Sequence, residues 1–112
     1  MDCIFCAIIK GDIPSKKVYE DELCYAFLDI APMAPVHCLI VPKEHIASAN
    51  DVDQGNASTV GHIFSVIPKI ATELGLSGGY RVITNVGEDG CQSVKHLHFH
   101  ILGGKKLPEN MA

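Results

Sequence analysis

The stretch Lys95-His96-Leu97-His98-Phe99-His100-Ile101-Leu102, near the end of the chain, alternates histidine with large apolar residues. Successive side chains of a β-strand point to opposite faces, so this alternation predicts a strand over residues 95–102 with two different faces. One face carries the three histidines: His96, His98 and His100. The other face carries apolar residues that we expect in the core: Leu97, Phe99 and Ile101.

Three neighbouring imidazoles on one face would repel one another if all were protonated. We therefore expect some of them to be neutral near pH 7, where an imidazole can act as a nucleophile, a base or a metal ligand. The sequence leaves two uses open, namely covalent catalysis at phosphorus and an open catalytic zinc site on the three histidines.

Composition restricts the class of protein. The 112 residues predict a single domain over 1–112, and the net charge of −4 without a basic run argues against a nucleic-acid partner. No apolar run approaches the ~18 residues of a membrane span, and the first residues lack a signal-peptide pattern, which predicts a cytoplasmic protein without membrane contact. In that compartment the five cysteines are expected as thiols or metal ligands.

Cys3 and Cys6 have the spacing of a zinc-binding pair, in a segment that otherwise predicts a short helix covering the core. A closed structural site of two thiolates and two imidazoles would leave the other histidines for catalysis, although the spacing does not select which two. Cys24, Cys38 and Cys91 are predicted to be small buried residues.

The remaining segments predict an α+β fold with an antiparallel sheet. We expect a hairpin over residues 18–28, a strand buried on both faces over 37–41, a long amphipathic helix over 59–74 and a strand over 80–85. Residues 47–58 are predicted to be a loop without regular structure. Pro68 and His62 lie off the apolar stripe of the helix, so we expect a solvent-side kink at Pro68 and a solvated His62.

A glycine-rich loop over residues 86–94 leads directly into the histidines. Glycines let backbone N–H groups approach an anion without obstruction from a Cβ atom, and Ser93 adds a hydroxyl group. The sequence therefore predicts a phosphate contact beside the histidines.

The segment His96–Leu102 resembles the His-φ-His-φ-His-φ-φ signature of the histidine triad (HIT) superfamily, in which φ is apolar. The similarity extends to Gly11-Asp12-Ile13-Pro14, Ala26-Phe27-Leu28-Asp29-Ile30, Val41-Pro42-Lys43-Glu44-His45-Ile46 and Gly90-Cys91-Gln92-Ser93-Val94, and it is closest to the nucleotide-binding, nucleoside-phosphoramidase branch. This resemblance implies a five-stranded antiparallel sheet with one long helix and a short N-terminal helix. It also implies a homodimer with a ten-stranded sheet.

The resemblance further implies hydrolysis at the α-phosphorus of purine nucleoside phosphoramidates or acyl nucleotides, with release of a nucleoside monophosphate of the AMP or GMP type. His98 is similar to the nucleophile that forms a nucleotidyl-histidine, and His100 and His37 are similar to its supporting residues. Asp29 resembles the acid that binds the ribose hydroxyls. The resemblance also implies apolar walls around a purine base, formed by Ile4, Phe5, Ile8, Phe27 and Ile30. The residues that it implies beside the phosphate and the leaving group are Asn85, Gln92 and Ser93.

Bacterial-type relatives imply a structural zinc site, and the matching residues are Cys3, Cys6, His45 and His96. No catalytic metal is expected from the resemblance. The chain departs from the family at Cys91, where glycine is common, and in residues 105–112, which lack a Trp-Pro-Pro ending. Because the resemblance places this tail at the partner's site, the departure concerns the choice of substrate. Alternative functions are a dinucleoside polyphosphate hydrolase and a nucleotide- or zinc-binding regulatory module with incidental turnover.

Overall fold

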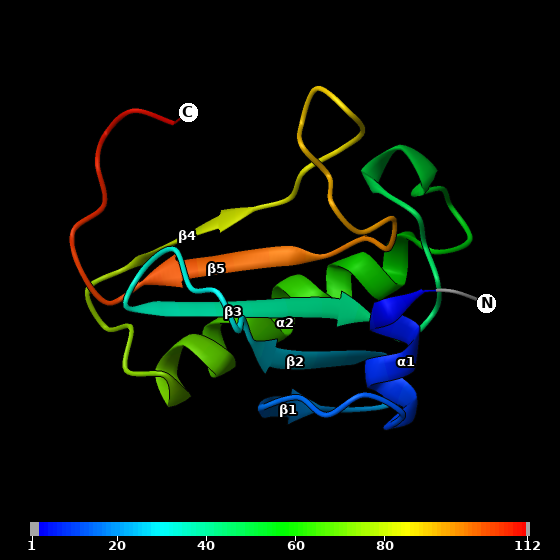
Figure 1. Cartoon of the computed structure of the whole chain (residues 1–112), viewed down its shortest axis with the longest axis horizontal. Coiled ribbons are helices and arrows are strands. Elements are labelled where there is room, and N and C mark those ends of the chain that lie inside the picture. The colour runs from blue at the N-terminus through cyan, green and yellow to red at the C-terminus, as the bar shows by residue number, and fades with distance from the viewer. Residues whose placement is uncertain (1–2, 112) are drawn as a thin grey trace.

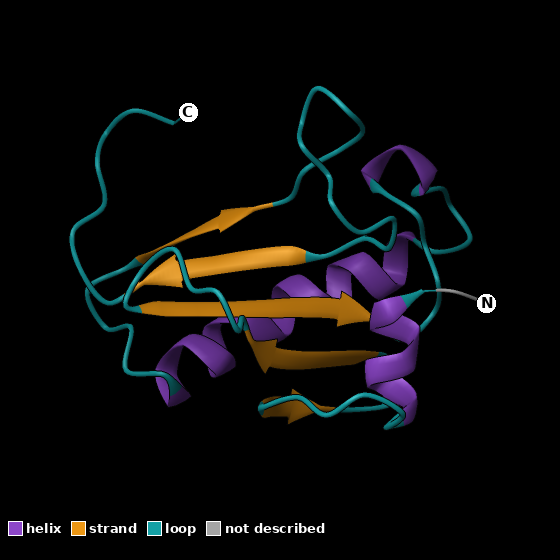
Figure 2. Ribbon diagram, in the orientation of Figure 1, coloured by secondary structure: helices purple, strands orange, loops and turns teal. Residues whose placement is uncertain are grey.

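The computed structural model describes residues 3–111 and contains one five-stranded antiparallel sheet with the strand order β1-β2-β3-β5-β4. Helix α2 lies along one face of the sheet, and the short helix α1 covers part of the other face (Figures 1 and 2). The elements are α1 (Ile4–Lys10), β1 (Lys17–Glu20), β2 (Cys24–Leu28), β3 (Val36–Pro42), the 3-10 helix η1 (Ala49–Asp51), α2 (Ala57–Glu73), β4 (Tyr80–Ile83) and β5 (Phe99–Gly103). The predicted α+β class and antiparallel sheet are confirmed.

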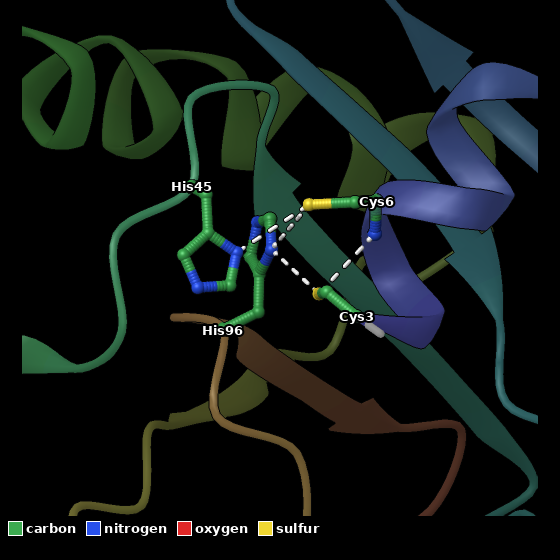
Figure 3. A group of neighbouring side chains, drawn as sticks. All are labelled: Cys3, Cys6, His45 and His96. Carbon is green, nitrogen blue, oxygen red and sulfur yellow. Dashed lines mark hydrogen bonds between the residues drawn. The ribbon is translucent and has the colours of Figure 1, made fainter. Parts of the chain in front are cut away.

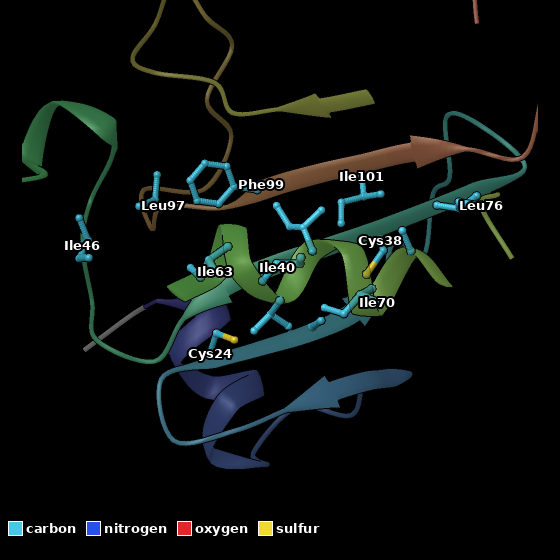
Figure 4. Packing of buried hydrophobic residues seen from close by; sticks show 14 residues of the cluster. Cys24, Cys38, Ile40, Ile46, Ile63, Ile70, Leu76, Leu97, Phe99 and Ile101 are labelled. Carbon is cyan, nitrogen blue, oxygen red and sulfur yellow. The ribbon is translucent and has the colours of Figure 1, made fainter. Parts of the chain in front are cut away.

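The central strand β3 separates two apolar clusters. Cys38 and Ile40 face α2, whereas Leu39 and Val41 face α1, and all four side chains are buried. Because alternate residues of a strand enter opposite clusters, an almost continuous apolar run is what a strand covered on both faces requires. The larger cluster, between the sheet and α2, includes Ile63 and Ile70 (Figure 4).

Helix α2 begins two residues before the predicted position and continues through Pro68, which is exposed on its solvent side. The prediction that His62 is merely solvated is wrong. Its Nε2 atom lies 2.6 Å from Oδ2 of Asp21, which joins α2 to the turn between β1 and β2. A side chain off the apolar stripe can still reach a carboxylate from another element. The spacing of apolar residues predicts which face of a helix is buried, but it does not predict such a polar contact.

The prediction of one continuous strand over residues 95–102 is also wrong, because β5 begins only at Phe99. The β3–β5 ladder ends where Ile40 pairs with Phe99, and the N–H of Leu97 instead donates to the carbonyl of Ile46, 2.6 Å away. The alternation of faces nevertheless persists through this irregular segment, since Leu97, Phe99 and Ile101 all lie in the cluster against α2.

Two loop predictions need correction. Residues 47–58, predicted to lack regular structure, contain η1 and a network in which Asn56 donates to the carbonyl of Asp51. Cys91, predicted to be buried, is exposed and has a left-handed backbone with φ of 56°. Asn and Gly favour that conformation, whereas Cys does not, so this backbone suits the glycine that the resemblance implies at position 91.

Within residues 3–111, none of the helices combines the length and apolar character needed to cross a membrane.

Candidate functional site

A cavity of about 420 Å³ opens between α1, the end of β2 and the segment that carries the histidines. Nine of the residues selected from the sequence line it: Ile4, Phe5, Ile8, Phe27, Asp29, Ile30, Ser93, His98 and His100. Most of the wall is apolar, with a few polar groups at one end, as is common for small-molecule sites. Ile30 is 97% exposed and forms the outer rim of the cavity, where its apolar surface is free to contact a ligand.

The orientation of His98 follows from one hydrogen bond. Its Nδ1 atom lies 2.7 Å from the carbonyl oxygen of His96, and a carbonyl can only accept, so Nδ1 carries the proton. In the neutral ring, Nε2 therefore holds a free lone pair. The His98 backbone is held in turn by the Thr84 hydroxyl, which donates to the His98 carbonyl at 2.7 Å. The arrangement prepares Nε2 of His98 to act as a nucleophile.

His37 and His100 have the opposite arrangement. The backbone N–H of Met33 donates to Nδ1 of His37 at 3.1 Å, so the proton of the neutral His37 ring lies on Nε2. That proton is donated to Nδ1 of His100, 2.9 Å away. The neutral ring of His100 must then carry its own proton on Nε2, and it offers a hydrogen-bond donor where His98 offers a lone pair.

Both of these imidazoles favour the neutral form. Burial, followed by the nearby rings of His98 and His37, lowers the pKa of His100 to about 4. Burial also lowers the pKa of His37, although the carboxylate of Asp29, whose Oδ2 lies 3.5 Å from Nε2 of His37, opposes that effect. The order of donors and acceptors described above is therefore the one that exists near neutral pH.

Asp29 lies at the end of β2, on the rim of the cavity. One carboxylate oxygen accepts from the N–H of Ala31 at 2.8 Å, and the backbone N–H of Asp29 donates to the carbonyl of His37 at 2.9 Å. These contacts fix the side chain while leaving capacity on the carboxylate for a ligand, because two oxygens provide about four acceptor positions.

Three of the residues selected from the sequence lie outside the wall of this cavity: His37, Asn85 and Gln92. His37 acts on the cavity through His100. The Gln92 amide holds the glycine-rich loop together, since its oxygen accepts from Gly87 and its nitrogen donates to the carbonyls of Ala47 and Val94. Gln92 thereby determines where the neighbouring Ser93 stands.

A second group of side chains, drawn in Figure 3, adjoins the first through His96, whose carbonyl accepts from His98. Its members are those that the resemblance selected, Cys3, Cys6, His45 and His96, and their potential ligand atoms all lie within 4.8 Å of one another. Nδ1 of His96 is 3.3 Å from Sγ of Cys3 and 3.6 Å from Sγ of Cys6. Nδ1 of His45 is 3.4 Å from Sγ of Cys6.

These separations fit a tetrahedral metal ion. Zinc bond lengths of about 2.3 Å to sulfur and about 2.0–2.1 Å to nitrogen place the two ligand atoms about 3.6 Å apart in a tetrahedron. Nε2 of His96 lies 2.8 Å from the carbonyl of Pro42, to which it must donate, so the lone pair of Nδ1 faces the sulfurs. Burial lowers the pKa of His96, which favours the neutral form that a metal needs.

The geometry disfavours a metal on the three histidines together. The ring of His96 turns toward the cysteines, Nδ1 of His98 is bound to a carbonyl, and His98 belongs to none of the potential ligand groups found within residues 3–111. The direction of its ring therefore places His96 with the cysteines, whereas His98 and His100 both line the cavity.

Sequence reasoning missed some of the cavity wall. Ile13, Pro14 and Ser15 follow α1 and also line the cavity, and the Ser15 hydroxyl lies 2.7 Å from that of Tyr25. Their composition predicts only a turn. Two signals were present in the sequence: Gly11, which ends α1 with a φ of 86°, and the resemblance of Gly11-Asp12-Ile13-Pro14 to the family.

Comparisons with known proteins agree with this geometry. The family model described as HIT domain matches residues 10–107. A histidine triad protein from Clostridium difficile is 55% identical with a TM-score of 0.94, covering 99% of this chain and 97% of that one. A HIT family hydrolase from Clostridium thermocellum is 46% identical with a TM-score of 0.96 and the same coverage.

A histidine triad nucleotide-binding protein from Candida albicans is more distant, at 36% identity and a TM-score of 0.82, and the match covers 99% of this chain and 87% of that one. The fold, the histidine segment and the extent of these matches lead to one assignment. This chain belongs to the HIT domain family.

Proposed function

We propose that this protein is a nucleotide hydrolase that cleaves purine nucleoside phosphoramidates or acyl nucleotides at the α-phosphorus. The observation that carries the proposal is the hydrogen bond from Nδ1 of His98 to the His96 carbonyl, which leaves a lone pair on Nε2 beside the cavity. Two structural neighbours, one named a hydrolase and the other a nucleotide-binding protein, support the class of reaction.

The reaction has two steps. Nε2 of His98 attacks the α-phosphorus, a bond forms between that nitrogen and phosphorus, and the bond from phosphorus to the leaving amine or acyl oxygen breaks. The leaving amine departs with a proton from the medium. Water then attacks the same phosphorus, loses one proton to the medium and breaks the phosphorus–nitrogen bond to His98, which releases the nucleoside monophosphate and restores the neutral imidazole.

The other site residues assist in distinct ways. The Nε2–H of His100 donates to an oxygen of the phosphoryl group, and His37 holds that ring in the required orientation. Asp29 accepts from the ribose hydroxyls, and Ser93 donates to the phosphate or the leaving group. The apolar wall binds the purine base through Ile4, Phe5, Ile8, Phe27 and Ile30, while Asn85 and Gln92 support the loop on the leaving-group side.

Zinc is the cofactor that we propose for the neighbouring group, held by Cys3, Cys6, His45 and His96. Two thiolates and two imidazoles complete a tetrahedral shell, and a closed shell of this kind is typical of structural sites. When bound, the ion supplies a cross-link between α1, the segment after β3 and the segment before β5.

A homodimer is part of the same proposal. Strand β4 ends the sheet order, and within residues 3–111 its outer edge has no neighbouring strand. Pairing of two such edges would produce a ten-stranded sheet and would cover an edge that otherwise exposes unpaired backbone groups. The location in the cytoplasm stays a prediction from the sequence.

Intact-mass analysis tests the chemistry and the residue together. Wild-type protein mixed with an adenosine 5′-phosphoramidate and quenched early is expected to gain the mass of one adenylyl group, and His98→Ala is expected to gain none. Equal turnover by His98→Ala would contradict the assignment of the nucleophile. Faster cleavage of dinucleoside polyphosphates would favour that alternative, and tight nucleotide binding without turnover of any substrate would favour a regulatory module.

A further inference from the structure

The nucleophile and the metal-binding group share a residue. The His96 ring directs Nδ1 toward Cys3 and Cys6, whereas the carbonyl of the same residue accepts the proton-bearing Nδ1 of His98. Any rotation of the His96 backbone that follows a loss of ligand contacts would move this acceptor. The orientation of His98 therefore depends on what holds the His96 ring.

Phe5 provides a second link between the two groups. It lies between Cys3 and Cys6 in the sequence, and its buried ring meets the His98 ring edge to face at 5.0 Å and 84°. The same ring lies 6.0 Å from the His96 ring. Cys3 also caps α1, because its sulfur accepts the N–H of Cys6 at 3.3 Å. The ligands of the metal group therefore also position α1, and with it the Phe5 ring that contacts His98.

The ligand atoms come from three parts of the chain, of which the segment after β3 and the segment before β5 are already joined by the hydrogen bond from Leu97 to Ile46. Cys3 is the N-cap of α1 and Cys6 lies within that helix, His45 is exposed in the segment after β3, and His96 is fully buried in the segment before β5. α1 has only seven residues, and isolated helices of that length are unstable in water. An ion that joins the three segments would therefore restrict the motion of α1 more than that of any other element.

We propose that the Cys3/Cys6/His45/His96 group is a positioning device for the nucleophile, which acts on His98 through the His96 carbonyl and the Phe5 ring. Metal binding orients the imidazole, so its effect falls on the transfer step and not only on global stability. The inference rests on the proposed role of His98, and it makes His96 and Phe5 positioning residues.

The test uses ring-nitrogen NMR of the full-length protein labelled with ¹⁵N-histidine and recorded without substrate. In the zinc-loaded protein, His98 is expected to show a protonated Nδ1 and an unprotonated Nε2. After removal of zinc with a chelator, or in Cys6→Ser, the two signals are expected to move toward each other as the ring samples both tautomers. Cys91→Ser, which changes an exposed thiol outside the group, is the matched control and should retain the wild-type spectrum.

Kinetics of the same samples separate orientation from binding. Loss of zinc is expected to lower kcat about tenfold or more while KM changes by less than about threefold, because a misplaced reacting atom affects the transfer step most. Unchanged His98 signals and an unchanged kcat in folded, zinc-free protein would overturn the proposal. The spectra need no substrate, so they test the link between the metal-binding group and His98 even if the protein has no phosphoramidase activity. Absence of that activity would count against the proposed function only.

A second variant covers the case in which zinc-free protein unfolds at the assay temperature. Phe5→Leu retains all four ligand residues and is expected to bind zinc, yet to alter the His98 signals. Phe64→Leu, the matched control, removes an aromatic ring on α2 that packs on Phe99 and lies outside the cavity wall, and it should leave those signals in place. Wild-type His98 signals in folded, zinc-loaded Phe5→Leu would overturn the proposal.

Discussion

His37 and His100 lie on the adjacent strands β3 and β5, and Nε2 of His37 donates to Nδ1 of His100 across 2.9 Å. The backbone N–H of Met33 occupies the other ring nitrogen of His37, so the direction of this bond is determined by atoms that cannot exchange roles. A short relay of fixed hydrogen bonds thereby decides which nitrogen of His100 faces the cavity as a donor.

The first prediction is that His37→Ala lowers kcat about 10- to 100-fold, because the ring of His100 loses the partner that fixes its tautomer and its orientation. Zinc content and the wild-type fold should be retained, since His37 touches none of the metal-binding residues. Steady-state kinetics with an adenosine phosphoramidate measure the effect, and His62→Ala, on the far side of the sheet, is the control. Equal losses in both variants would point to a general loss of stability instead.

How far the sequence predicts this site is clear from the three histidines. Their alternation correctly separated the apolar face from the polar one, and the resemblance distinguished His96 from the other two. The predicted strand is too long, because the backbone ladder with β3 ends at the pair of Ile40 and Phe99, and the N–H of Leu97 donates to Ile46 instead. Such long-range partners have no periodic signature, which also explains why the contact between His62 and Asp21 was missed.

The second prediction concerns pH. An unfolded histidine has a pKa near 6.5, whereas burial lowers the pKa of His100 to about 4 and also lowers that of His37. Between these values the unfolded chain binds protons that the folded protein does not, so stability is present above pH 6.5 and decreases as the pH falls toward 4. For His100 alone the loss is at most about 3 kcal/mol.

Urea unfolding at a series of pH values between 7 and 4 measures this loss. In His100→Gln the decrease in the free energy of unfolding over that range should be smaller than in wild type, because one of the buried titrating groups is gone. Both proteins are compared in the same buffer and with the same zinc loading, so that release of the metal affects them equally. Parallel curves for the two proteins would contradict the assigned cause.

The third prediction concerns Asp21, whose carboxylate accepts from the Tyr19 hydroxyl, the His62 ring and the backbone N–H groups of Leu23 and Cys24. These hydrogen bonds hold its pKa well below the usual range even though partial burial opposes the shift. The ionised form is favoured in the folded state, so its contribution is present above pH 4 and is lost as the solution becomes more acidic.

Asp21→Ala should therefore lower the free energy of unfolding at pH 7 by about 2–3 kcal/mol, the range for losing hydrogen bonds to a charged group. Chemical denaturation measures the change. Asp12→Asn, at an exposed carboxylate after α1, is the matched control and should stay within about 0.5 kcal/mol of wild type. A similar small effect for Asp21→Ala would mean that water replaces its partners at little cost.

The fourth prediction is that Cys3→Ser lowers both zinc content and thermal stability. The substitution removes one of four ligands, whereas serine is itself a favoured N-cap residue, so α1 should become the least stable element of the fold through loss of the metal cross-link alone. Metal analysis combined with thermal melts measures both effects, and chelation of the wild type should reproduce the lower melting temperature. Wild-type zinc content in Cys3→Ser would exclude the proposed ligand set.

The fifth prediction concerns Cys91, the one non-glycine residue within 3–111 that has a positive φ. A Cβ atom in the left-handed region costs roughly 1–2 kcal/mol, and a β-branched side chain tolerates it worst. Cys91→Gly should therefore be as stable as wild type or more stable by up to about 1 kcal/mol, whereas Cys91→Val should be less stable by about 1–2 kcal/mol.

Urea unfolding of the two variants at pH 7 gives the comparison, and kinetics show whether the loop retains its function. The Cys91 N–H donates to the carbonyl of Glu88, and the next residue, Gln92, fastens the loop to Ala47. Position 91 is only two residues from Ser93, so backbone strain there should displace the Ser93 hydroxyl. Cys91→Val should therefore also raise KM for a phosphoramidate. If Cys91→Val matched wild type in both stability and KM, the loop would have to adjust its backbone freely, and Gln92 could not be what holds Ser93 at the cavity.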